Sequence, residues 1–247
     1  MKIKKIATRF ILLGALLAML GAVSLAQTVP HPAGHWQGKI QIPEHETGIT
    51  VDLDRSTNGM WIGSMSVLGS SSINVPITNI TVEDTAVRFS ASLPEKASFD
   101  ARLSADGSGL SGTATNTAGS APFQLTRNGE ANVRVPPPSS ALSADFAGSW
   151  EGTLEANGKV RHIGLKLSAT ADGTATATLI AMDKGNLEIP VSTVTIRDKQ
   201  LDMESRAVSG AYHGTLGVDG TIVGEWVEAA NRLPVTFKRV PPEARKP

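Results

Sequence analysis

Alternation of apolar and polar residues with a period of two is the dominant pattern of this chain. Residues 163–168 alternate Ile and Leu with Gly, Lys and Ser, and residues 174–179 alternate Thr with apolar residues. The runs at 191–196 and 235–237 follow the same pattern with β-branched and aromatic residues. Such alternation is typical of half-buried antiparallel strands. No segment after residue 26 sustains a helical period over three turns, so we expect an all-β protein.

Turn sequences separate these runs at regular intervals. Asp172-Gly173, Asp198-Lys199 and Asp219-Gly220 interrupt the second half, and Asn58-Gly59 and Asp106-Gly107 interrupt the first. Asp-Gly suits tight hairpins, whose central residues need positive φ. The spacing of roughly 10–12 residues predicts about eight short strands in each half.

The two halves are copies of one another. Residues 33–38 (AGHWQG) match residues 147–152 (AGSWEG), an offset of 114. The same offset pairs Pro76 with Pro190, and near the end an offset of 112 pairs Arg127 with Arg239. Ordered matches over so much of each half are the signature of an internal duplication.

The duplication divides the chain into five segments. They are a signal peptide (1–26), a first copy (27–127), a Pro-rich linker (128–146), a second copy (147–239) and a tail (240–247). An eight-strand meander hides its edges best by closing into a barrel. We therefore predict two tandem antiparallel, barrel-like domains of the lipocalin and avidin type. The alternatives are a sandwich, or one larger sheet built by both copies.

The first 26 residues have the three parts of a secretory signal peptide. A basic start with Lys2, Lys4, Lys5 and Arg9 precedes an apolar stretch at 11–22, and Ser24-Leu25-Ala26 supplies a small–x–small cleavage site. The apolar stretch is shorter than the ~20 residues that span a bilayer. We expect cleavage after Ala26, a periplasmic or secreted bacterial protein, and no stable membrane insertion afterwards.

The composition excludes several classes of protein and of functional site. The 247 residues include 23 basic and 23 acidic side chains and no Cys. The absence of Cys excludes a disulfide scaffold, a Cys-ligated zinc site and a thiol nucleophile. Four basic residues belong to the signal peptide, so 19 basic and 23 acidic residues remain, a net charge of −4. That balance argues against nucleic acid as a partner.

The second copy resembles a known β-domain. The resemblance is carried by Gly148 to Leu154, Asp183-Lys184-Gly185, Tyr212 to Leu216, Gly224-Glu225-Trp226 and Leu233-Pro234-Val235. These segments resemble a domain of secreted bacterial proteins that often precedes an α/β-hydrolase domain. The hydrolase part is absent here, so the resemblance implies a noncatalytic module. The chain has Lys184 and Glu228-Ala229 where that family more often has Gln and Gln-Gly.

Catalytic motifs are missing from the sequence. Neither a Gly-x-Ser-x-Gly elbow nor a phosphate-binding Gly-x-x-x-x-Gly-Lys-Ser/Thr occurs. Histidines and acids at residues 31–46 lack a recognised metal-ligand spacing. Asp183, Glu225 and Glu228 are the carboxylates that a glycosidase would need, but the sequence does not set their separation. We expect no catalytic residue, no metal and no cofactor.

Residues that recur in both copies favour a structural role, and residues present in one copy are better candidates for binding. Trp36 and Trp150 recur. The candidate ligand-binding residues, each present in one copy, are Trp61, Met182, Lys184, Tyr212, His213 and Trp226. The function expected is an exported, noncatalytic binding protein for a small apolar ligand or an exported protein. The alternatives are an accessory module for a separately encoded exported hydrolase, and a cryptic hydrolase.

Overall fold

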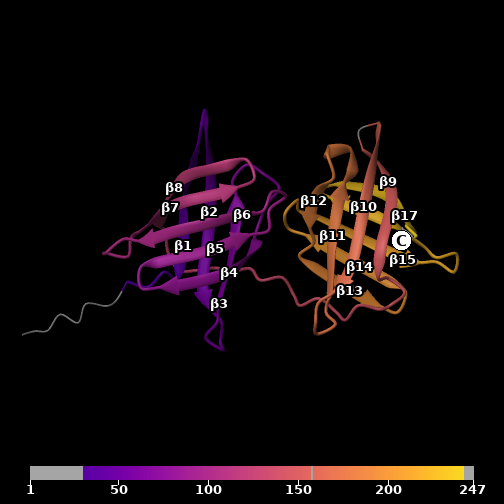
Figure 1. Cartoon of the computed structure of the whole chain (residues 1–247), viewed down its shortest axis with the longest axis horizontal. Coiled ribbons are helices and arrows are strands. Elements are labelled where there is room, and N and C mark those ends of the chain that lie inside the picture. Colours follow the sequence, from indigo (N-terminus) through magenta and orange to yellow (C-terminus); the bar gives the residue numbers. More distant parts are fainter. Residues whose placement is uncertain (1–29, 157, 242–247) are drawn as a thin grey trace, which may run out of the picture.

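The computed structural model describes residues 30–156 and 158–241, so the expected signal peptide lies outside the described residues. Two barrel-like β-domains lie side by side, each built from its own sheet (Figure 1). This confirms the predicted all-β class and two barrel-like domains. The described residues contain a single helical turn, η1 (Met182–Lys184). No described helix has the length and apolarity needed to cross a membrane.

The first barrel is a closed meander of eight strands. Each strand pairs antiparallel with its neighbour in sequence, and β1 closes the ring by pairing with β8. The strands are β1 (Gly34–Ile42), β2 (His45–Arg55), β3 (Trp61–Val67), β4 (Val75–Glu83), β5 (Ala86–Ala91), β6 (Ala97–Leu103), β7 (Gly109–Asn116) and β8 (Gly119–Arg127).

The second barrel has nine strands where eight were expected. Its first strand again pairs with its last, β9 with β17. The strands are β9 (Gly148–Ala156), β10 (Lys159–Ala169), β11 (Ala175–Ala181), β12 (Leu187–Pro190), β13 (Thr193–Arg197), β14 (Gln200–Ser205), β15 (Gly210–Leu216), β16 (Thr221–Glu228) and β17 (Asn231–Arg239). The extra strand arises because the counterpart of β4 is split in two.

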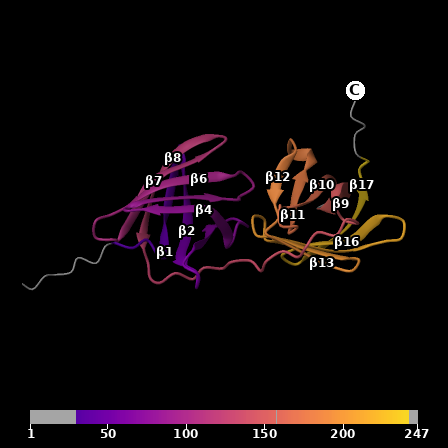
Figure 2. The ribbon, with the colours of Figure 1, turned by 60° about the horizontal axis from the view of Figure 1, so that its bottom comes forward.

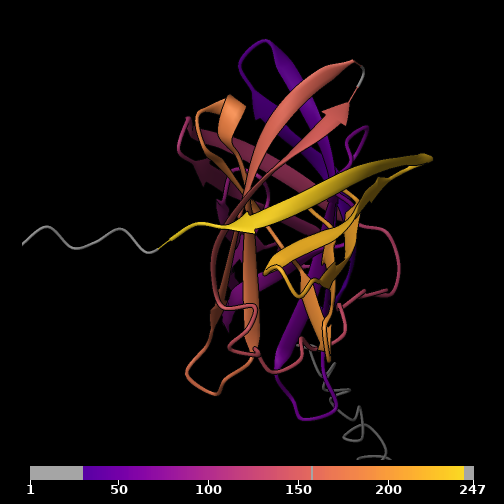
Figure 3. The same ribbon diagram turned by 90° about the vertical axis from the view of Figure 1, so that its right-hand side faces the viewer.

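The split strand changes partners between its two parts. β12 pairs with β11, and β13 pairs with β14, so these two strands are the edges of a curled sheet (Figure 3). The residues between them span the gap, since Val191 N donates to Ala177 O (3.3 Å) and Ser192 N to Glu204 O (2.7 Å). β12 ends at Pro190 and β13 begins at Thr193, whereas β4 continues through Pro76, so proline alone does not account for the split.

The inward residues of each barrel form a separate apolar core. Phe89, Phe99 and Phe123 pack as an aromatic cluster in the first barrel, with ring centroids 4.7 and 5.6 Å apart. Glycine permits close strand contacts at matching places in the two copies. A Cβ on Gly38 would lie 1.9 Å from Gln124 O, and one on Gly152 would lie 2.6 Å from Thr236 O.

A Trp–Arg pair joins the first and last strands of each barrel. Trp36 and Trp150 are buried, and each indole Nε1 donates 2.9 Å to the carbonyl four residues earlier. The guanidinium of Arg127 lies 4.4 Å from the Trp36 ring, and that of Arg239 lies 4.2 Å from the Trp150 ring. Each arginine also donates to two carbonyls of the segment before β1 or β9. The recurring tryptophans are therefore structural.

Residues 128–146 run from one barrel to the other (Figure 2) and are bonded to both. Asn132 N donates to Asp52 Oδ1 of the first barrel at 2.8 Å. Ser140 N donates to Val194 O of the second barrel at 2.9 Å, and Phe146 is fully buried in the second core. The linker is thus held at both ends.

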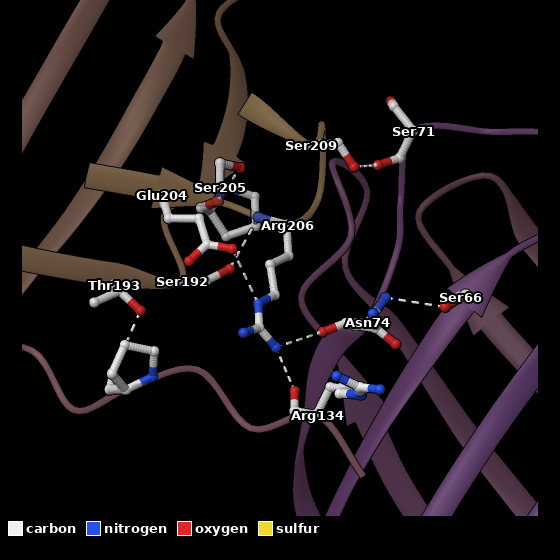
Figure 4. A network of polar contacts seen from close by, with 12 residues as sticks. Ser66, Ser71, Asn74, Arg134, Ser192, Thr193, Glu204, Ser205, Arg206 and Ser209 are labelled. Carbon is white, nitrogen blue, oxygen red and sulfur yellow. Dashed lines mark hydrogen bonds and ion pairs between the residues drawn. The ribbon is translucent and has the colours of Figure 1, made fainter. Parts of the chain in front are cut away.

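Two loops join the barrels directly. Loop 68–74, between β3 and β4, meets loop 206–209, between β14 and β15. Buried Ser72 Oγ donates to Ala207 O (2.7 Å), and Ile73 N donates to Arg206 O (3.2 Å). The Arg206 guanidinium donates to Asn74 O (3.2 Å) and to Arg134 O of the linker (Figure 4). Arg206 of the second barrel is therefore hydrogen-bonded to both the first barrel and the linker.

Replacing Trp36 by Phe should destabilise the first barrel. The variant keeps an aromatic ring but leaves Pro32 O without its buried donor, which costs about 1–3 kcal/mol. Trp61→Phe is the control in the same barrel, because Trp61 is only partly buried; we expect a change within about 0.5 kcal/mol. Urea unfolding followed by circular dichroism measures both. Equal losses in the two variants would contradict the role assigned to the Trp36 indole.

Replacing Arg206 by Ala should loosen the contact between the barrels. Hydrogen bonds from a charged donor are worth about 1.5–3 kcal/mol, so amide exchange in loop 68–74 should accelerate by roughly tenfold or more. Arg197→Ala is the matched control, because Arg197 is exposed and its ion pair with Asp202 is long, at 3.9 Å. Hydrogen exchange followed by mass spectrometry measures the exchange rate of loop 68–74 in both variants. Unchanged exchange in Arg206→Ala would show that the guanidinium does not hold the interface.

Candidate functional site

A cavity of about 580 Å³ opens at the end of the second barrel that faces the first. Its walls come from β9, β10, β11, η1, β12, β16 and β17, together with Val208 of the loop 206–209. Ser71 of the first barrel also lines it, and this residue accepts a hydrogen bond from Ser209 Oγ (2.5 Å, Figure 4). The contact between the barrels therefore completes the wall of the cavity.

The lining of the cavity is mostly apolar, and inward positions of the strands, such as Leu154, Ile163 and Leu179, supply much of it. Several of the lining residues are only partly buried. They pack against the fully buried residues of the second core, such as Trp150 and Tyr212. The apolar side chains that line it are Leu154, Ala156, Ile163, Leu179, Ile180, Ala181, Ile189, Val208, Trp226, Ala229 and Leu233. Trp226 is the largest of them and is 8% exposed.

Polar groups lie around this apolar wall. The Asp183 carboxylate accepts hydrogen bonds from His162 N (2.7 Å) and from His162 Nδ1 (3.1 Å). The backbone bond from His162, followed by its side-chain bond, lowers the pKa of Asp183, so this carboxylate is ionised at neutral pH. Glu228 Oε2 lies 3.5 Å from Trp226 Nε1. Arg161, Lys184 and Asn231 complete the polar lining, together with Ser71.

The first barrel has different residues at the matching positions. Thr47 of the first barrel occupies the position of Arg161. Thr47 pairs with Ile40 on β1, and Arg161 pairs with Leu154, the matching residue on β9. By the same pairing, Ala114 matches Trp226, and Asn116 matches Glu228. The charges of Arg161 and Glu228 and the indole of Trp226 therefore have no counterpart in the first barrel.

Two of the six sequence-predicted ligand residues meet at the cavity: Lys184 and Trp226 both line it. Met182 lies next to them in η1, but it does not line the cavity. Trp61 lies on the first barrel, where Arg55 stacks on its ring at 4.4 Å.

Tyr212 and His213 lie elsewhere in the second barrel. Tyr212 is buried in the core, where its hydroxyl lies within hydrogen-bond distance of Ile222 O (3.2 Å) and Val235 O (3.3 Å). That burial raises the pKa of Tyr212 far above its usual value. His213 is exposed on the next residue of β15, with Nδ1 2.8 Å from Asp202 Oδ1.

The three carboxylates considered for glycoside hydrolysis do not share one wall. Asp183 and Glu228 line the cavity, whereas Glu225 is paired with Arg232 on the neighbouring strand β17. Sequence reasoning missed Arg161 as a cavity residue. The signal was present, because Arg161 takes the place of an apolar residue in the alternation that continues with Ile163, Leu165 and Leu167.

Comparisons with known proteins add little to this site. No protein-family model matches the chain, and no curated protein matches it. Among solved structures, it is similar to a protein of unknown function from the DUF3598 family of Nostoc punctiforme, at 13% identity over 84% of this chain and 96% of that one, with a TM-score of 0.24. A "putative outer membrane protein" from Bacteroides fragilis matches at 11% identity over 84% and 97%, with a TM-score of 0.26. Scores this low carry no argument about function, so the site is interpreted from its own residues.

Proposed function

We propose that this protein is an exported, noncatalytic binding protein that holds a small apolar ligand in the cavity of its second barrel. The observation that carries the proposal is the cavity itself. Its volume of about 580 Å³ lies within the range of small-molecule sites, and most of its lining is aliphatic or aromatic. An apolar ligand would remove partly exposed side chains such as Leu154, Ile163 and Leu233 from water, which favours binding.

The polar groups of the cavity support binding more than catalysis. His162 and Asp183 are hydrogen-bonded to one another on the rim, and both side chains are largely exposed. A general base acts on a nucleophile held in the site and works best where water is excluded. His162 and Asp183 have no bound nucleophile beside them and are open to water. We therefore assign them a structural role, in which their hydrogen bonds hold η1 against β10.

Filling the cavity should abolish binding of an apolar probe. In Ile163→Trp, the larger side chain occupies the inward position on β10, so the uncharged dye phenylnaphthylamine should lose its emission increase on mixing with the protein. Val160→Trp is the matched control, because Val160 lies on the same strand, is 61% exposed and does not line the cavity. The measurement is dye fluorescence, with circular dichroism to verify folding.

The outcome separates a cavity site from surface adsorption. Loss of dye binding in Ile163→Trp alone supports the proposal. Equal binding by both variants, or no binding by the unsubstituted protein, would contradict it.

Export has its own test. Expression of the full chain in a bacterium with a periplasm should yield a protein whose first residue is Gln27, because Ser24 and Ala26 form the cleavage site. N-terminal sequencing and intact mass of the periplasmic fraction measure this. Recovery of the protein only from the cytoplasm, still carrying residues 1–26, would contradict export.

A further inference from the structure

Arg161 is a charged residue on the inward face of a barrel strand. Along β10 it alternates with His162, Gly164 and Lys166, and it shares its face with Ile163, Leu165 and Leu167. Leu165 and Leu167 are core residues, so Arg161 continues the row of core side chains toward the cavity. It is half-buried and lines the cavity. Charged side chains are rarely placed on such a face without a partner.

The guanidinium of Arg161 has no hydrogen-bond or ion-pair partner among the residues that the structure describes. Several other arginines are bonded: Arg127 and Arg239 to carbonyls beside the tryptophans, Arg206 across the interface, Arg88 and Arg232 to carboxylates. The guanidinium groups of Arg102 and Arg134 also lack a described partner, but both residues are exposed to water, whereas Arg161 is half-buried. Lys184, on the same cavity, is likewise without a described partner. Two cations without a described hydrogen-bond or ion-pair partner therefore line one cavity, the half-buried Arg161 and the exposed Lys184.

The acidic groups of the cavity form no hydrogen bond or ion pair with these donors, although Asp183 and Arg161 attract one another at longer range. The Asp183 carboxylate is bonded to His162, through both the backbone N and the ring Nδ1. Glu228 lies beside the indole of Trp226 and forms no ion pair with Arg161 or Lys184. A guanidinium offers five N–H donors in a planar fork, a shape that fits the oxygens of carboxylate, phosphate and sulfonate groups.

We propose that the ligand of the second barrel is an amphipathic anion. Its apolar body occupies the cavity, and its anionic end group binds Arg161, with Lys184 as a second cation. This inference rests on the proposed function, because it identifies the class of ligand for the same cavity. The first barrel has Thr47 at the position of Arg161, so anion recognition belongs to the second copy alone.

Two dyes that differ by one charged group test the proposal. Phenylnaphthylamine is uncharged, and anilinonaphthalene sulfonate carries a sulfonate on the same ring system. Arg161→Thr, which reproduces the residue of the first barrel, should weaken binding of the sulfonate by roughly tenfold or more, the loss expected for a hydrogen bond to a charged group. The affinity for the uncharged dye should not decrease, because this dye makes no use of the positive charge.

The matched control is Lys166→Met. It removes one positive charge from the same strand, but Lys166 is exposed and points away from the core face. Both dyes should bind this variant as they bind the unsubstituted protein. Arg161→Lys should retain part of the sulfonate affinity, and Arg161→Gln serves as a second neutral variant if Arg161→Thr fails to fold.

The outcomes separate this inference from the proposed function. A selective loss of sulfonate binding in the neutral Arg161 variants supports an anionic ligand. Unchanged sulfonate binding, equal loss of both dyes, or an equal loss in Lys166→Met overturns the anionic ligand while leaving an apolar cavity. Failure of both dyes to bind the unsubstituted protein overturns the proposed function, and the anionic ligand with it.

Discussion

The stacking of an arginine on a buried tryptophan where the first and last strands meet is the contact on which both barrels depend. A meander becomes a barrel only if its ends meet, and its two end strands lie far apart in sequence. Arg127 brings the end of β8 onto Trp36, and Arg239 brings the end of β17 onto Trp150. Each arginine also binds carbonyls of the segment before the first strand, so ring closure and the entry of the chain are fixed together. In a chain without Cys, this noncovalent closure takes the place that a disulfide holds in many exported proteins.

Both sheets have this pairing of first and last strands, but only the first sheet is closed, and the two interiors also differ in the residues that fill them. Strand pairing aligns Phe89, Phe99 and Phe123 of the first barrel with Met203, Tyr212 and Val235 of the second. In the first barrel Phe89 stacks on Phe99, and Phe123 meets Phe99 edge-to-face. In the second barrel the strand between β11 and β14 is split, and the partly buried layer above the core borders a cavity. A cavity of about 580 Å³ thus lies in the second barrel, and a smaller one of about 270 Å³ borders Phe89 and Phe99 of the first.

The sequence predicted local features well and long-range contacts poorly. Alternation, turn dipeptides and the internal repeat predicted an all-β chain with two barrel-like domains, because each of these signals is local or periodic. The split at Pro190 to Ser192 was missed, since a proline at the matching position, Pro76, leaves β4 continuous. The interface between loops 68–74 and 206–209 has no local signature, because its hydrogen bonds join residues about 135 positions apart in the sequence. For the site, uniqueness to one copy identified Trp226 and Lys184 but not Arg161, whose significance depends on which face of β10 points inward.

The inward arginine also explains why the cavity is better suited to an amphipathic than to a wholly apolar ligand. A charge on the core face of a strand loses part of its hydration. No described residue of the second barrel forms a hydrogen bond or an ion pair with Arg161 that would offset that loss, and Asp183 acts on it through Coulombic attraction alone. A wholly apolar ligand would remove more of the hydration of Arg161, because it would displace the water that still reaches the guanidinium. An anion would instead replace that water with charge-assisted hydrogen bonds, so the same residue that disfavours one class of ligand favours the other. The first barrel avoids the problem with Thr47, whose hydroxyl carries no charge, and its centre is filled by phenylalanine. Arg161 lies beside a cavity, so an anionic group has room to bind it. For this reason we assign Arg161 a role in ligand specificity and do not regard it as an unpaired charge in the core.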